Sequence, residues 1–147
     1  MSLESDVKRM AGASPFHLLP REAVQLLAFS CEKRAYKKGD TLFREGDAAE
    51  GGLLLLEGEV VLSANGEQRR AGPGALIGET ALVAEVFRGA TAEAASDVSA
   101  LRIPRPTFRR VLGEFPEAAV KVRALAAARA GKLLGALERV RVREFGG

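Results

Sequence analysis

Residues 59–70, Glu59-Val60-Val61-Leu62-Ser63-Ala64-Asn65-Gly66-Glu67-Gln68-Arg69-Arg70, decide the fold of this chain. Two strand-like runs, Glu59–Ser63 and Glu67–Arg70, lie on either side of the pair Asn65-Gly66. Asn and Gly tolerate the positive φ that both central positions of a type I′ turn require, and this turn matches the twist of a two-residue hairpin. The stretch therefore predicts a β-hairpin.

The pattern of this hairpin extends outward over residues 35–104. Short apolar or alternating runs are separated by turn residues, which is typical of an all-β fold. We predict a mainly β protein with flanking α-helices, built as an eight-stranded β-roll, like a jelly roll, that leaves few open sheet edges. The eight predicted strands are Ala35–Tyr36, Thr41–Phe43, Leu53–Leu56, Glu59–Ser63, Glu67–Arg70, Ala75–Ile77, Thr91–Ala94 and Val98–Ile103.

Helical patterns flank the β region on both sides. Before it, Pro20 suits a first helical turn and the apolar-rich run 24–31 follows. After it, a short helix is predicted from Pro106 to near Gly113, and a long one from Pro116 toward Arg143. The long helix carries an approximate heptad stripe that would pack on the β body or on a second copy. The stripe consists of Val122, Ala126, Ala130, Leu133, Leu137 and Val140.

We interpret residues 1–147 as a single domain with three parts. These are an N-terminal helical part (1–34), the β-roll (35–104) and a C-terminal part (105–147) whose helices serve as a lid or a dimer contact.

The composition of the chain argues against several classes of function. The 22 basic and 19 acidic residues give a net charge of only +3, without the clustered basic stripe of a nucleic-acid binder. A lone cysteine, Cys31, excludes an internal disulfide. The apolar runs are too short to cross a membrane, and residues 1–20 do not have the pattern of a signal peptide. We therefore expect a cytoplasmic protein without direct nucleic-acid or membrane contact.

The residues best suited to binding a ligand lie in the segment 77–91. After the strand that ends at Ile77, Gly78 leads into a short helical turn over 79–83, whose free N–H groups favour an anion. Nine residues after Glu79 comes Arg88, whose guanidinium suits two phosphate oxygens at once. Glu79 could accept a hydrogen bond from a sugar hydroxyl.

This segment resembles the phosphate-binding cassette of the cyclic nucleotide-binding domain family, approximately F-G-E-x-A-L-L, a spacer, then R-x-A-T. The chain has Ile77-Gly78-Glu79-Thr80-Ala81-Leu82-Val83 and Arg88-Gly89-Ala90-Thr91. Further resemblances are the turn at 38–47, the hairpin at 54–60, the glycine-rich turn Gly72-Pro73-Gly74, and the last strand and following helix around 101–108. Together they cover roughly Phe16 to Leu112.

The resemblance implies a role for each matching residue. Arg88 would pair with the exocyclic oxygens of a cyclic phosphate, and Glu79 would accept from the ribose 2′-hydroxyl. The backbone of Gly78, Thr80, Ala81, Gly89 and Ala90 would complete the cradle. In relatives the C-terminal helix closes over the base, which makes Arg129 the candidate for a base contact and helix closure the candidate switch.

Two departures from the family pattern bear on the ligand. Phe87 stands where a proline often precedes the arginine, and Gly89 stands where Ala, Ser or Thr is usual. A hydroxyl at this position favours cGMP in the family, so Gly89 favours cAMP as the ligand over cGMP. No metal or other cofactor is expected.

Other functions fit these residues less well. A cupin-like metalloenzyme needs several His and Glu ligands, whereas His17 is the single histidine and lies outside the β region. Nucleophilic catalysis lacks a histidine base near Cys31 or any serine, so no enzyme is expected. A ligand-free β-roll, acting as a protein-interaction or dimerisation module with its charges paired to each other, stays open.

The sequence also leaves open how the domain is used. A transcription factor of the bacterial cAMP-receptor type would need roughly sixty further residues for a helix-turn-helix. A stand-alone binding protein and the regulatory fragment of such a factor, lacking its DNA-binding part, are both compatible with the residues. Homodimerisation through the C-terminal helix is expected, although Gly131 and Gly135 weaken a long rigid coiled coil.

Overall fold

The computed structural model describes the backbone of residues 3–139 and the side chains of residues 3–129. The helices within this range are α1 (Leu3–Ala11), η1 (Phe16–Leu18), α2 (Arg21–Ser30), η2 (Glu79–Leu82), α3 (Arg105–Gly113) and α4 (Pro116–Arg139), where η marks a 3-10 helix. The strands are β1 (Glu32–Tyr36), β2 (Thr41–Phe43), β3 (Ala48–Ala49), β4 (Gly51–Glu57), β5 (Val60–Ala64), β6 (Glu67–Ala71), β7 (Leu76–Ile77), β8 (Val86–Phe87), β9 (Thr91–Ala94) and β10 (Val98–Pro104).

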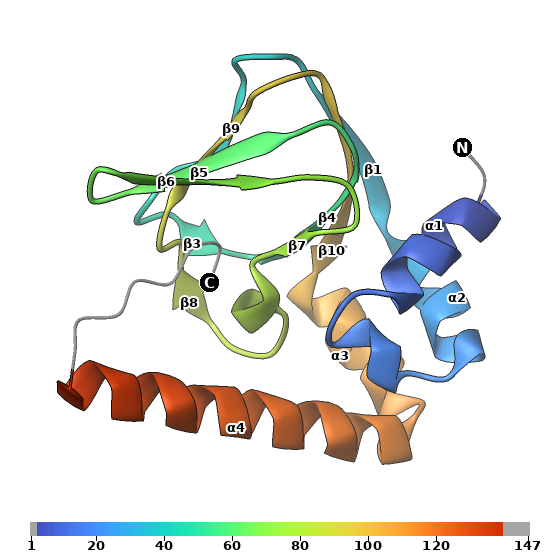
Figure 1. The fold of residues 1–147 in the computed structure, drawn as a ribbon. Coiled ribbons are helices and arrows are strands. Elements are labelled where there is room, and N and C mark those ends of the chain that lie inside the picture. The colour runs from blue at the N-terminus through green and yellow to red at the C-terminus, as the bar shows by residue number, and fades with distance from the viewer. Residues whose placement is uncertain (1–2, 140–147) are drawn as a thin grey trace.

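The strands form two four-stranded antiparallel sheets with the orders β1-β10-β4-β7 and β2-β9-β5-β6, and a small pair β3-β8. The predicted hairpin is present, with β5 and β6 in register from Val60–Ala71 to Ala64–Glu67. Its turn residues Asn65 and Gly66 have φ values of 52° and 79°, as a type I′ turn requires. The prediction of a mainly β roll with flanking helices is confirmed (Figure 1).

All eight predicted strands form, several with shifted ends, and the structure adds two short strands. The short strands β3 and β8, two residues each, were not predicted, because so short a run carries no periodicity. The first strand begins at Glu32, earlier than the predicted Ala35, since Glu32 already pairs with Arg102 of β10. The helical part at the N-terminus consists of three helices, and α2 begins directly after Pro20.

Strand β4 is the centre of the packing. Leu53 and Leu55 face the space between the two sheets, whereas Leu54 and Leu56 face a second cluster formed with the helices. Side chains of a strand alternate between faces, so burial on both faces explains the unbroken apolar run Leu53–Leu56. The helical cluster includes an edge-to-face pair of Phe16 and Phe108, with ring centroids 5.8 Å apart.

Helices α1, α2 and α3 gather at one end of the roll, and α4 runs past η2 beneath it (Figure 1). Val122 of the predicted apolar stripe is buried and Ala126 is half-buried. The side chains of Ala130, Leu133 and Leu137, the residue Val140 and the predicted continuation toward Arg143 lie outside the described residues. Between residues 3 and 139, no helix combines the length and the apolar character that a membrane span needs.

Candidate functional site

The segment that sequence analysis singled out forms a tight strand–turn–helix unit. Gly78, at φ 82° and ψ 37°, caps η2 in the left-handed region, a conformation that glycine adopts without steric cost. Ala81 is fully buried, Glu79 is half-buried and Thr80 is exposed, so only part of η2 faces solvent. The predicted short helical turn over 79–83 is confirmed, with η2 ending at Leu82.

Arg88 is held in the interior, where arginine is rarely found. Its side chain is 9% exposed, and Nη2 donates to the carbonyl oxygen of Gly51 at 2.8 Å. Its Cζ lies 4.2 Å from the centroid of the Phe43 ring, a cation–π contact that helps to compensate for the lost water. Nη1 is buried and has no hydrogen-bond partner among the residues that the structure describes.

The charge of Arg88 is therefore incompletely compensated. Burial lowers the pKa of its guanidinium, while the nearby carboxylates of Asp47 and Glu50 raise it. Arginine remains protonated in proteins, so Arg88 cannot avoid the cost of desolvation by losing its proton. The folded state therefore contains a buried positive charge, which is unfavourable. An anion at Nη1 would lower this cost and fill the open hydrogen-bonding position.

Glu79 is contacted by two parts of the chain that flank the roll. Its Oε1 forms an ion pair with Nη1 of Arg129 on α4, and it accepts from the hydroxyl of Ser14 at 3.3 Å. Nη2 of Arg129 also donates to Oγ of Ser14, at 3.1 Å. The side chains of Glu79 and Arg129 are 33% and 47% exposed, so this three-residue cluster is open to solvent. Such pairs contribute at most about 1 kcal/mol, which makes the cluster easy to exchange for another partner.

Both parts of the segment are anchored to the start of β4. Helix η2 packs against β4, and Arg88 reaches the carbonyl of Gly51, the first residue of that strand. Ala90 is fully buried and Gly89 half-buried. The structure thus places η2 and the guanidinium of Arg88 against β4, and it brings Arg129 to Glu79.

Sequence analysis missed three residues that shape the site: Ser14, Phe43 and Gly51. Only Gly51 carried a signal, because two glycines before an apolar strand indicate a close approach of another backbone. A Cβ at Gly51 would lie 2.0 Å from the carbonyl oxygen of Ile103.

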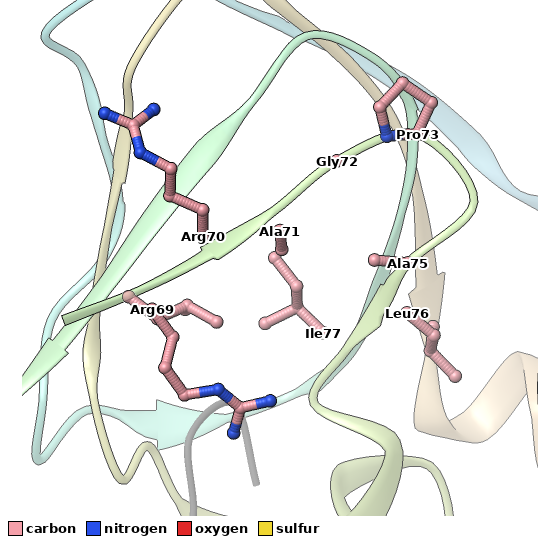
Figure 2. A pocket seen from close by; sticks show the side chains of 9 residues that line it. Arg69, Arg70, Ala71, Gly72, Pro73, Ala75, Leu76 and Ile77 are labelled. Atoms are coloured by element: carbon pink, nitrogen blue, oxygen red, sulfur yellow. The ribbon is translucent and has the colours of Figure 1, made fainter.

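A cavity of about 370 Å³ adjoins the segment (Figure 2). Its last lining residue, Ile77, directly precedes Gly78, and the guanidinium groups of Arg69 and Arg70 point to different sides of it. Its volume lies in the range of small-molecule sites. The lining residues are Leu62, Arg69, Arg70, Ala71, Gly72, Pro73, Ala75, Leu76 and Ile77.

The chemistry of the segment is that of an anion site. Within the described part of the chain, no three His, Cys, Asp or Glu side chains gather as metal ligands. The segment instead holds the buried cation Arg88, whose Nη1 has no partner among the described residues, the carboxylate of Glu79 with its solvent-exposed partners, and the exposed Glu85. This combination can hold a negatively charged group together with a neighbouring hydroxyl.

Comparisons with known proteins agree with this chemistry. The sequence model of the family described as "Cyclic nucleotide-binding domain" matches residues 33–115, more than half of the chain. The cyclic AMP receptor protein of Thermus thermophilus is 32% identical over 126 residues, which cover 82% of this chain and 58% of that protein. The cAMP-dependent protein kinase regulatory subunit of Debaryomyces hansenii is 39% identical over 85 residues, 56% of this chain and 19% of the subunit.

A solved structure shows the same fold. The N-terminal domain of a transcriptional regulator from Streptomyces coelicolor A3(2) superposes with a TM-score of 0.75 at 30% identity, over 92% of this chain and 97% of that domain. This chain therefore spans nearly all of that solved N-terminal domain, but less than two thirds of the length of the two curated relatives.

Proposed function

This chain belongs to the cyclic nucleotide-binding domain family. On that premise we propose that it binds cAMP in preference to cGMP, and that binding changes the contact between α4 and the β-roll. The observation that carries the proposal is the buried Arg88, whose Nη1 lacks a partner within the described residues. A cyclic phosphate supplies the anion that this group requires.

The proposed binding mode assigns one part of the ligand to each part of the segment. Arg88 holds the exocyclic phosphate oxygens, and the backbone of Gly78, Thr80, Ala81, Gly89 and Ala90 lines the cradle. Glu79 accepts from the ribose 2′-hydroxyl. The cavity next to Ile77 would receive the base, and Arg129 would contact the base from α4.

Calorimetric titration of the wild-type chain with cAMP, cGMP and 5′-AMP tests this proposal. We expect micromolar or tighter binding of cAMP, weaker binding of cGMP, and much weaker binding of 5′-AMP, whose open phosphate differs in shape and charge. Absence of binding for both cyclic nucleotides would favour the ligand-free β-roll that acts through protein contacts.

Selectivity should respond to a hydroxyl at position 89. Gly89 is not among the glycines with positive φ, so serine fits its backbone. One added hydrogen bond to the guanine would raise the affinity for cGMP relative to cAMP by about two- to tenfold in Gly89→Ser. Gly89→Ala, which adds a Cβ without the hydroxyl, is the matched control in the same titrations. An unchanged ratio in Gly89→Ser would contradict this account of selectivity.

The response of α4 follows from the partners of Glu79. When the ribose hydroxyl reaches Glu79, it competes with Arg129 and Ser14 for the same Oε1. The ion pair is weak because it is solvent-exposed, so a bound ligand can shift the population of α4 positions. The proposed signal is this change of contact between α4 and the roll.

Spin labels at Gln68→Cys on β6 and Ala127→Cys on α4 would measure the shift. Both positions are exposed, and burial raises the pKa of the native Cys31 thiol to about 12, so Cys31 should resist labelling. We expect cAMP to change the label–label distance distribution, and 2′-deoxy-cAMP, which lacks the competing hydroxyl, to change it less. Identical distributions with and without saturating cAMP would contradict movement of α4.

Three wider proposals accompany this function. We propose that the chain acts without catalysis of its own, in the cytoplasm, and as a homodimer through its C-terminal helix. Because it spans 58% of one curated relative and 19% of another, action alone and action as the regulatory part of a longer protein are both compatible with the domain.

A further inference from the structure

We infer that Arg105 is a positioning residue that holds the two halves of the cyclic-nucleotide site in register. Its Nη1 lies within hydrogen-bond distance of three carbonyl oxygens, those of Ala49 at 2.9 Å and of Ala81 and Ala84 at 3.1 Å each. Ala49 belongs to β3, whereas Ala81 and Ala84 lie in and just after η2. One guanidinium thus joins two segments that are not adjacent in sequence.

The carbonyls that Arg105 contacts are otherwise difficult to satisfy. The last carbonyls of any helix have no partner within that helix, and η2 has only four residues. A cation at the carboxyl end of a helix is favourable, and a guanidinium can serve several acceptors from a rigid plane. Arg105 therefore stabilises the carboxyl end of η2.

The second segment links Arg105 to Arg88. Residues 49–51 lie between the two guanidinium groups, since Arg105 donates to Ala49 and Arg88 donates to Gly51. The backbone N–H of Arg105 also donates to the carbonyl of Glu50 at 2.9 Å. Residues 49–51 are therefore held by three contacts, and the position of Arg88 relative to η2 depends on Arg105.

The contacts distinguish Arg105 from the other arginines on the same helix. Arg105 is half-buried at the first position of α3, whereas Arg109 and Arg110 are exposed. The inference rests on the proposed function, because positioning matters only if the two segments hold one ligand. It adds a residue outside the 77–91 segment that touches no part of the ligand.

Arg105→Gln, Arg105→Lys and the matched control Arg110→Gln would test the role. Titration with cAMP measures affinity, and hydrogen exchange of the ligand-free protein compares peptides that cover 78–87 with peptides that cover 60–71. We expect Arg105→Gln to raise the Kd for cAMP about tenfold, consistent with the loss of its backbone hydrogen bonds. Exchange should accelerate in 78–87 and not in 60–71, and Arg105→Lys should recover part of both effects.

Three results would overturn the inference. These are an unchanged Kd for Arg105→Gln, an equal effect of Arg110→Gln, or accelerated exchange over 60–71 as large as that over 78–87, which would indicate general destabilisation. If the wild type binds no cyclic nucleotide, the proposed function fails. Exchange over 78–87 then decides separately whether Arg105 holds η2.

Discussion

Replacing Arg88 with methionine is expected to weaken cAMP binding by about a hundredfold or more, since two charge-assisted hydrogen bonds to the phosphate are worth about 3 kcal/mol. The folded state should be as stable as the wild type or more stable. The buried guanidinium has a lowered pKa, and its Nη1 has no hydrogen-bond partner in the part of the chain that the structure describes. An apolar side chain of similar length removes this desolvated charge. Loss of binding together with retained stability would indicate that the charge of Arg88 serves to bind the ligand and not to stabilise the fold.

Calorimetry with cAMP and thermal unfolding without ligand measure the two quantities. Arg88→Lys keeps the charge but loses the fork of donors, so its binding should also be poor. Arg110→Met is the matched control, because Arg110 is exposed on α3 and belongs neither to the 77–91 segment nor to the lining of the cavity. Binding by Arg88→Met within a few-fold of the wild type would remove the central element of the proposed function.

Replacing Gly51 with alanine is expected to destabilise the fold by about 3 kcal/mol, near the upper end of typical overpacking costs. The added Cβ would lie 2.0 Å from the carbonyl oxygen of Ile103 and 2.9 Å from Cα of Pro104. Because both neighbours are backbone atoms of the paired strand β10, no side-chain rotation relieves the contact. The strands β4 and β10 must separate locally, and the acceptor of Arg88 moves with them.

Chemical denaturation of the ligand-free protein measures this effect. Gly72→Ala is the matched control, since a Cβ at Gly72 would meet no atom within 4 Å and the φ of Gly72 lies outside the left-handed region. It should change the unfolding free energy by less than about 0.5 kcal/mol. A Gly51→Ala variant as stable as Gly72→Ala would show that β4 and β10 are not closely packed at this point.

The local features of the fold were predictable from short stretches of sequence. The Asn65-Gly66 hairpin and the turn at Gly78 depend on φ angles that only a few residue types adopt, so the residue types themselves indicate them. The roll was predictable because turn residues recur at intervals that suit short antiparallel strands. Strands β3 and β8 were not, because two residues cannot show a period.

The candidate site was predictable in its residues but not in its contacts. Glu79 and Arg88 stand nine positions apart and could be assigned from their chemistry and from the family pattern. Their partners could not, because Arg88 contacts a carbonyl 37 positions away and Glu79 an arginine 50 positions away. Arg129 and Ser14, which meet at Glu79, are separated by 115 positions.

The sequence by itself determined eight of the ten strands in the described residues, the turns and the identity of the charged residues, since each depends on backbone preferences and side-chain chemistry over a few neighbours. Only the tertiary structure decided that Arg88 is buried with a donor that no described residue pairs, that Glu79 is shared by α4 and the N-terminal segment, and that Arg105 joins β3 to η2. The physical reason is that desolvation and hydrogen bonding depend on what the whole chain brings to one place. The residue type alone does not show whether a charged side chain is buried or exposed.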